Sequence, residues 1–273
     1  MKVSGREVAD VIAKKLRKQV IKLKVKPTLA IILAGHDPSS RMYVDFKIKK
    51  AIEIGVGIKY FEFQENQFQK CTQIIDRLNA DKTVHGIIIQ YPIFDSWDFD
   101  KVFSLVNPKK DVDGFHVDSP FSGATALGVW EMLNEFVRLE GFSSLEKFLR
   151  NKKIVLLGKG KTAGGPVRQL LQKKQVQFYL IDSKTPNPEE IIKEADVIIS
   201  ATGKKNIITG EKIKKGSFVI GVGVGKEDGR IYGDIEESSV SEKAKLYCPT
   251  IGGIGPLTIV NLLKNTIDAA GML

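Results

Sequence analysis

A glycine-rich segment, residues 154–166, has the pattern of a strand, a tight turn and the start of a helix. Gly158, Gly160 and Gly164 would let the backbone approach a phosphate group, and a helix start supplies amide donors and a partial positive charge. Asp182 ends the next strand pattern, 24 residues after Gly158, near the place where an acid accepts from an adenosine ribose hydroxyl. The spacing departs from the usual fingerprint by one residue. The glycines and Asp182 together favour a dinucleotide site, and an ordinary strand-to-helix turn remains the alternative.

Two later segments end strand patterns on the same side of the predicted sheet. Thr202 with Gly203 follows one strand, and residues 221–224 follow another. Open α/β sheets bind ligands beyond the carboxyl ends of their strands, so both segments are candidates for cofactor contact. Both are also compatible with ordinary turns.

A second group of polar residues shares one helix face in the N-terminal part of the chain. Ser40, Tyr43, Lys47 and Lys50 lie three, four and three residues apart, and residues at these intervals stack above one another on a helix. An exposed tyrosine and lysine stripe is more often a solvated surface, so the spacing alone does not establish a functional site.

Gln90 ends an apolar strand pattern, and Asp111 and Asp113 lie in a glycine-containing loop further along. That loop lacks the additional oxygen ligands of a calcium site. The histidines are scattered without the His-x-x-x-His spacing of a zinc helix, and they are His36, His85 and His116. We therefore expect no protein-bound metal.

Alternating strand and helix patterns predict a doubly wound α/β protein with two lobes. In the first lobe we expect helices at 5–25, 37–54 and 67–79 and strands at 29–35, 61–63 and 86–92. In the second we expect strands at 153–157, 176–181, 196–200, 218–222 and 245–248, and a final helix at 256–269. The turn-rich stretch 107–114 marks the boundary. We place a catalytic domain at 1–118, with the C-terminal helix 255–273 returning to it, and a Rossmann-like domain at 119–254.

Composition restricts the class of protein without naming it. The 273 residues carry a net charge of +10, which suits an anionic small substrate, a membrane surface or nucleic acid. No apolar run approaches the roughly 18 residues of a membrane span, and no signal peptide is evident, so we expect a cytoplasmic protein. Cys71 and Cys248 have no metal or disulfide spacing, and we interpret both as buried thiols.

Four ordered segments resemble successive signatures of the bifunctional methylenetetrahydrofolate dehydrogenase/cyclohydrolase family. They are residues 38–47, 86–92, 110–116 and 252–258. The resemblance spans nearly the whole chain and implies that Lys47 is the catalytic acid or base. It further implies that Tyr43 orients Lys47 and covers the folate, that Gln90 supports Lys47 or the substrate, and that Asp113 grips the pteridine ring. A lysine in a partly desolvated cleft suits this role, because its pKa falls towards neutrality.

The same resemblance implies a folate substrate, a nicotinamide cofactor and a homodimer, without a nucleic-acid or membrane partner. It implies hydride transfer from 5,10-methylenetetrahydrofolate, then opening of the methenyl form by water to 10-formyltetrahydrofolate. The implied substrate contacts are Ser40, Tyr43, Asp113, Gly252, Gly253, Pro256 and Thr258. The implied cofactor contacts are Gly158, Lys159, Gly160, Gly164, Asp182, Ser183, Thr202 and Val224.

The choice between NADP and NAD stays open at this point. The family usually has Arg-Ser where this chain has Lys159 and Gly160, and often histidine where this chain has Asp182. These changes weaken the expected grip on a 2′-phosphate and favour NAD. Lys159, Ser183 and Lys184 could still form a phosphate pocket, and NADP is the family default.

Two alternatives remain. The chain could be a monofunctional dehydrogenase or cyclohydrolase of the same family, or a non-enzymatic nucleotide- or nucleic-acid-binding protein that uses its positive charge.

Overall fold

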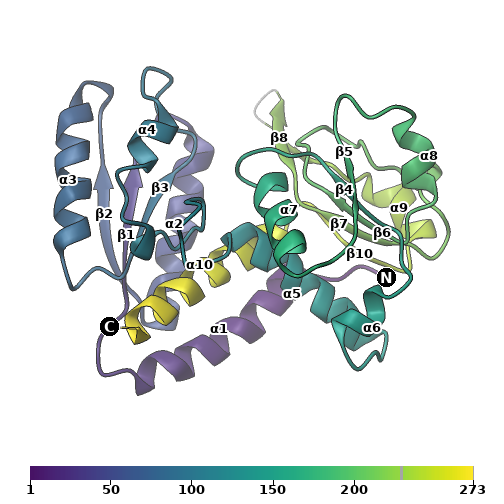
Figure 1. Ribbon diagram of the computed structural model, residues 1–273, viewed down its shortest axis with the longest axis horizontal. Coiled ribbons are helices and arrows are strands. Elements are labelled where there is room, and N and C mark those ends of the chain that lie inside the picture. Colours follow the sequence, from purple (N-terminus) through teal and green to yellow (C-terminus); the bar gives the residue numbers. More distant parts are fainter. Residues whose placement is uncertain (228–229, 273) are drawn as a thin grey trace. The chain divides into compact units, whose positions relative to one another are not determined.

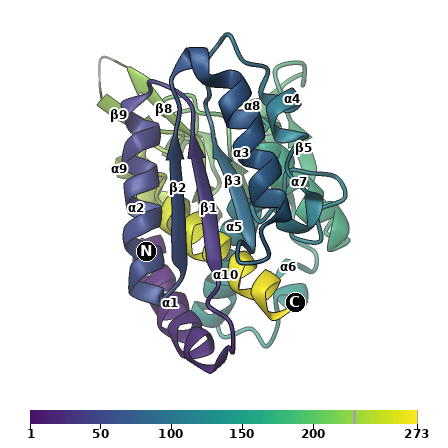
Figure 2. The same cartoon turned by 90° about the vertical axis from the view of Figure 1, so that its left-hand side faces the viewer.

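A three-stranded parallel sheet forms the centre of one part of the protein. Its strands are β1 (Thr28–Leu33), β2 (Gly57–Glu62) and β3 (Gly86–Gln90), in the order β2-β1-β3. β1 and β3 are almost entirely buried, as expected for strands covered on both faces. Figure 2 shows α3 (Phe68–Ala80) in front of this sheet and α10 (Ile254–Gly271) behind it.

A five-stranded parallel sheet forms the centre of the other part (Figure 1). In the order β10-β7-β6-β4-β5, its strands are Leu246–Cys248, Phe218–Gly221, Val197–Ser200, Ile154–Leu157 and Tyr179–Ile181. The connecting helices are α7 (Gly164–Lys173), α8 (Pro188–Lys193) and α9 (Glu237–Lys243). The chain leaves β4 for β5 on one side and returns to β6 on the other side, so the sheet has a topological switch point between β4 and β6.

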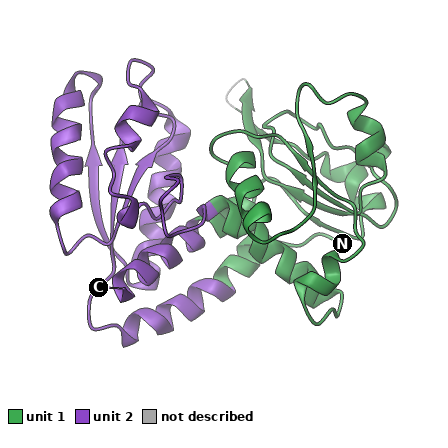
Figure 3. Ribbon diagram, viewed as in Figure 1, with its two compact units in different colours: residues 1–10, 125–258 green, residues 11–124, 259–273 purple. Residues whose placement is uncertain are grey.

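The computed structural model describes residues 1–227 and 230–272, and these fall into two compact units (Figure 3). Unit 1 comprises Met1–Asp10 and Thr125–Thr258, with the five-stranded sheet. Unit 2 comprises Val11–Ala124 and Ile259–Leu273, with the three-stranded sheet. The divisions fall inside α1 (Gly5–Lys22) and α10 and at the start of α5 (Ala124–Leu139). No helix of the described residues is long and apolar enough to span a membrane.

The predicted α/β class and parallel sheets are confirmed, but several boundaries differ. β2 starts at Gly57, earlier than the predicted 61–63. β5 starts at Tyr179, later than the predicted 176, and the Val176 N–H instead donates to the Leu171 carbonyl near the end of α7. Elements that had not been predicted are α4 (Phe99–Phe103), α5, α6 (Leu145–Leu149) and the antiparallel pair β8 (Val224–Glu227) and β9 (Arg230–Gly233). Short 3-10 turns occur at Glu65–Gln67, Pro108–Lys110 and Gly210–Lys212.

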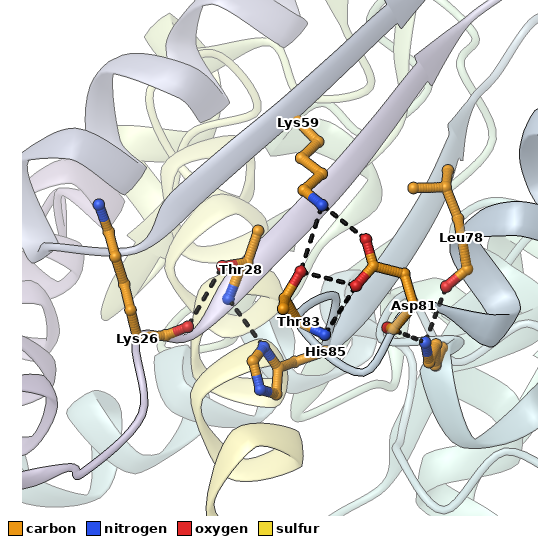
Figure 4. A network of polar contacts seen from close by, with 8 residues as sticks. Lys26, Thr28, Lys59, Leu78, Asp81, Thr83 and His85 are labelled. Atoms are coloured by element: carbon orange, nitrogen blue, oxygen red, sulfur yellow. Dashed lines mark hydrogen bonds and ion pairs between the residues drawn. The ribbon is translucent and has the colours of Figure 1, made fainter.

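Polar contacts tie together the amino ends of the strands in unit 2 (Figure 4). The Thr28 N–H donates to His85 Nδ1 at 3.1 Å, which joins the start of β1 to the residue before β3. Lys59 Nζ of β2 lies 2.6 Å from an Asp81 carboxylate oxygen. Lys110 Nζ donates to the Asp81 carbonyl at 2.7 Å. These contacts fix the end of the sheet opposite to the carboxyl edge.

Candidate active site

Helix α2 (Pro38–Ile54) begins at the carboxyl end of β1 and is capped at both ends. The Asp37 carboxylate accepts from the N–H groups of Ser39 and Ser40, and Pro38 occupies the first turn, where it has no amide hydrogen to leave unpaired. Gly55 ends the helix in the left-handed region with φ 99°. The caps fix the start and end of the helix that carries the predicted polar stripe.

Lys47 lies on the buried face of α2 and is only 9% exposed. Its Nζ donates to Gln90 Oε1 at 2.6 Å, which joins α2 to the carboxyl end of β3. Ser40 is buried on the same face, and Tyr43 is half-buried between them. The solvated-surface interpretation of this stripe is therefore wrong for Ser40 and Lys47.

Asp113 supplies a negative charge to Lys47. Burial lowers the pKa of Lys47 below its ordinary value, and the Asp113 carboxylate opposes that change. Burial likewise raises the pKa of Asp113, and Lys47 opposes this in turn. Each group therefore makes the ionised form of the other less unfavourable. A lysine in this setting can hold or release a proton nearer to neutrality than a solvated lysine.

Asp111 organises the loop that presents Asp113. Its carboxylate is fully buried and accepts from the Gly114 N–H at 2.9 Å and from the His116 N–H at 2.7 Å. Burial is the main cause that raises the pKa of Asp111 to about 6, while these backbone donors oppose it. Gly114 sits in the left-handed region with φ 69°, a conformation that glycine adopts without strain.

Asn265 of α10 anchors the same loop from the C-terminal end of the chain. Its side-chain amide donates to the Val112 carbonyl at 2.9 Å and to the Ser122 carbonyl at 3.1 Å. No sequence motif had pointed to Asp111 or Asn265 as organisers of the loop, because both act through backbone groups.

The Tyr91 carbonyl joins two of the predicted residues. Ser40 Oγ donates to it at 3.3 Å and Gln90 Nε2 donates to it at 2.8 Å. Burial raises the pKa of the Tyr43 phenol, so this group stays protonated and able to donate at neutral pH. Unit 2 thus brings Ser40, Tyr43, Lys47, Gln90 and Asp113 to the carboxyl edge of its sheet.

The glycine turn of unit 1 lies at the switch point of the five-stranded sheet. Gly158 has φ 90°, and a Cβ there would lie 2.4 Å from the Ala201 carbonyl oxygen after β6. A Cβ on Gly164, the first residue of α7, would lie 2.3 Å from the Gly158 carbonyl oxygen. Only glycine permits this close backbone turn. The amides at the start of α7 and the exposed backbone at Gly160 fit a dinucleotide pyrophosphate.

Asp182 follows β5 beside this turn. Its carboxylate lies 2.7 Å from Lys159 Nζ and accepts from the Lys184 N–H at 2.9 Å. The Lys159 hydrogen bond is the largest of the causes that lower the pKa of Asp182. Ser183, between these residues, is exposed.

Thr202 is held at the carboxyl end of β6 by a residue that the sequence had not singled out. Asp234 is fully buried, and one of its oxygens accepts from Ser200 Oγ and from the Thr202 N–H, each at 2.7 Å. Gly223 lies directly against that carboxylate, because a Cβ on Gly223 would lie 2.5 Å from Asp234 Oδ2. Val224 begins β8 and is partly exposed.

The remaining predicted substrate contacts belong to unit 1. Gly252 has φ 78°, and a Cβ on Gly253 would lie 1.8 Å from the Pro249 carbonyl oxygen. These glycines form the turn that leads into α10, which contains Pro256 and Thr258. Among residues 1–227 and 230–272, no cluster of three or more histidine, cysteine or acidic side chains could hold a metal ion.

A doubly wound sheet with a glycine turn at its switch point is typical of a nucleotide-binding α/β protein of the Rossmann class. The family described as tetrahydrofolate dehydrogenase/cyclohydrolase matches in two parts, its catalytic domain at residues 3–113 and its NAD(P)-binding domain at residues 123–272. The chain belongs to this family.

Individual relatives agree over almost the full length. The bifunctional protein FolD of Caldanaerobacter subterraneus subsp. tengcongensis is 34% identical, over 98% of this chain and 96% of the relative. The structure of the Campylobacter jejuni FolD dehydrogenase/cyclohydrolase has a TM-score of 0.90 at 30% identity, over 100% of this chain and 99% of that one. The Trypanosoma brucei enzyme, solved with NADP and an inhibitor, has a TM-score of 0.88 at 30% identity, over 100% and 97%.

Proposed function

We propose that this chain oxidises 5,10-methylenetetrahydrofolate to the methenyl form and then hydrolyses that form to 10-formyltetrahydrofolate. Family membership supports both reactions, and the comparisons favour neither the monofunctional nor the non-enzymatic alternative. The observation that carries the proposal is the buried Lys47, bonded to Gln90 and influenced by the Asp113 charge. Such a lysine suits the second reaction, in which water must lose a proton as it adds to the methenyl carbon.

In this proposal Lys47 moves the proton and Gln90 holds its Nζ in place. Asp113 grips the pteridine ring, since a carboxylate accepts from ring nitrogen donors. Tyr43 orients Lys47 and covers the folate, and Ser40 contributes to the same surface. By the family resemblance we also propose substrate contacts by Gly252, Gly253, Pro256 and Thr258.

The nicotinamide cofactor supplies a hydride acceptor for the first reaction when it is bound. Its proposed contacts are Gly158, Lys159, Gly160, Gly164, Asp182, Ser183, Thr202 and Val224. The support for this assignment is the glycine turn, whose backbone would be blocked by any Cβ at Gly158 or Gly164. The protein's part is to bind, orient and exclude water around the reacting groups.

We also propose the functional division 1–118 with 255–273 for folate and 119–254 for the dinucleotide. The family resemblance supports a cytoplasmic homodimer whose product enters purine biosynthesis. Sedimentation of the pure protein at several concentrations tests the dimer.

The test of function is to follow the absorbance of the methenyl compound. Pure protein is mixed with methylenetetrahydrofolate and either dinucleotide, and separately with the methenyl compound alone. The proposal expects formation of the methenyl form in the first assay and its accelerated loss in the second. Activity in only one assay would show a monofunctional enzyme. Activity in neither, together with salt-sensitive oligonucleotide binding, would replace the proposal by the nucleic-acid alternative.

A further inference from the structure

Asp182 occupies the position in unit 1 that meets the adenosine ribose in a Rossmann-type sheet. It directly follows β5, which pairs with β4, and the Gly158 turn follows β4. The Gly158 N–H donates to the Ile181 carbonyl at 2.9 Å, so the turn and the end of β5 are directly bonded. A side chain at this position reads whether the ribose carries a 2′-hydroxyl or a 2′-phosphate.

The Asp182 carboxylate is held in place by hydrogen bonds within unit 1. One oxygen accepts from the Lys184 N–H and the other from Lys159 Nζ. The Asp182 N–H in turn donates to Thr185 Oγ1 at 3.0 Å. Its lowered pKa keeps it ionised at neutral pH, and an ionised carboxylate only accepts hydrogen bonds. It can accept from a ribose hydroxyl and has nothing to donate to a phosphate.

Lys159 is the cation that pairs with Asp182, at 2.7 Å between Nζ and a carboxylate oxygen. A 2′-phosphate carries a charge of about −1.5 to −2. Because Lys159 is paired with Asp182, a phosphate at this position would compete with that carboxylate for Lys159 and would lie beside its negative charge. A ribose hydroxyl causes no such competition.

Gly160 supplies no hydroxyl to this surface. A Cβ built there meets no heavy atom within 4 Å, so the position has room for a side chain and carries none. The space also allows a test in which a serine is added without crowding the turn.

We propose that Asp182, held by Lys159, makes the cofactor site of this chain selective for NAD over NADP. The inference rests on the proposed function and names the cofactor of that same site. Asp182 accepts from the adenosine ribose hydroxyl and repels a 2′-phosphate, and Lys159 acts through Asp182 as a positioning residue.

Calorimetric titration with NAD and NADP, in the absence of folate, tests the inference by binding alone. The unmodified chain is expected to bind NAD at least about tenfold more tightly, the scale of one hydrogen bond to a charged group. Asp182→Asn keeps the side-chain volume but removes the charge, so NADP binding should strengthen by about tenfold, while NAD binding should weaken through loss of the charged acceptor. Asp182→Ser combined with Gly160→Ser should move the preference further towards NADP.

Glu190→Gln in α8 is the matched control, because it removes an exposed acidic charge from the same unit. Its ratio of the two affinities should equal that of the unmodified chain. Thermal unfolding of each variant confirms that it is folded. The inference would be overturned if the unmodified chain bound NADP more tightly, or if the ratio of NAD to NADP affinity were unchanged in both Asp182 variants. Folate turnover in either case would leave the proposed function intact. Binding of neither dinucleotide would overturn both.

Discussion

The two units use the carboxyl edge of a parallel sheet in different ways. In unit 2 the edge is formed by side chains, and the proposed reactive group is Lys47, which is buried and bonded to Gln90. In unit 1 the edge is formed by backbone, and its key positions are Gly158 and Gly164, where no side chain fits. A group that moves protons must be tuned by its surroundings, whereas a group that binds phosphate needs close approach of amides. Under the proposed function, the same sheet geometry therefore serves catalysis in unit 2 and dinucleotide binding in unit 1.

The largest expected effect is in unit 2. Lys47→Met keeps much of the buried stem and removes the proton carrier, so cyclohydrolase activity should fall by about 10²–10⁴, the usual scale of general acid–base catalysis. Dehydrogenase activity should fall less, because hydride transfer depends mainly on alignment. Lys49→Met, at an exposed position of the same helix, is the control and should leave both rates near normal. Near-normal hydrolysis by Lys47→Met would remove Lys47 from catalysis.

Gly158→Ala should impair the dehydrogenase more than the cyclohydrolase, the opposite of Lys47→Met. The new Cβ would lie 2.4 Å from the Ala201 carbonyl oxygen at a φ of 90°, and such a clash with strain disfavours the native turn by about 2–4 kcal/mol. We expect dinucleotide affinity and dehydrogenase efficiency to fall by about 10², with hydrolysis of the methenyl compound largely retained.

Gly141→Ala separates the clash from the backbone strain. Gly141 also has a positive φ, 72°, but a Cβ there meets nothing within 4 Å. The Gly141→Ala variant should lose some stability and keep its dinucleotide affinity. If both glycine variants bind the dinucleotide normally, the close backbone approach has no part in binding.

Substitutions of Gln90 are expected to have smaller effects, whose direction depends on the charge of the new side chain. Gln90→Leu removes the acceptor of Lys47 Nζ, so the pKa of Lys47 should fall further and hydrolysis should slow by about 10–100-fold, the range for a hydrogen bond to a charged group. Gln90→Glu adds a carboxylate beside Lys47 and should raise that pKa. The pH dependence of cyclohydrolase kcat/KM should therefore shift in opposite directions in the two variants. Shifts in the same direction would mean that Gln90 does not act through Lys47.

The weakest effect should be on stability, at the opposite edge of the unit 2 sheet. Burial lowers the pKa of His85 from its ordinary 6.5, the nearby Lys110 lowers it further, and Asp81 opposes this. The unfolded chain therefore binds this proton more readily, so stability falls as the pH drops from 6.5 towards the folded value. In urea, the free energy of unfolding of the unmodified chain should be about 1 kcal/mol lower at pH 5.5 than at pH 7.5, the value of one hydrogen bond. The His85→Gln variant should not show this loss.

The opposing contribution of Asp111 cancels in that comparison. Its pKa is raised to about 6, so the folded chain binds this proton more readily and stability from this group falls as the pH rises through 6. Asp111 is unchanged in His85→Gln, and the difference between the two proteins isolates His85. Equal pH dependence in both would exclude His85 as the source.

The sequence predicted most of the fold because its signals are local. The cap at Asp37, the apolar run of β1 and the glycine turn after β4 all lie within a few residues of the structure they specify. The pair β8 and β9 was not predicted, since four residues per strand give too short an alternation to recognise.

The site was predictable only in part, for a related reason. Helical spacing put Ser40, Tyr43 and Lys47 on one face, but it did not show that Ser40 and Lys47 are buried. Asp234 stayed unnoticed as an organiser because its partners are a serine hydroxyl and a backbone amide of another segment, up to 34 residues away. The partners of Asp111 are only three and five residues away, but they are backbone amides, which a residue pattern does not reveal. Contacts of this kind become visible only once the tertiary structure is known.

A titration of Lys47 in the folded protein tests whether unit 2 holds a lysine whose proton is available for catalysis. The protein is prepared with isotope-labelled lysine, and side-chain resonances are followed by NMR between pH 6 and pH 11, with Lys47→Met used to assign the Lys47 signal. We predict that the signal missing from Lys47→Met titrates below the ordinary lysine value of 10.5. A midpoint at or above 10.5 for that signal would show that Lys47 is not tuned towards neutrality and would rule out its proposed role.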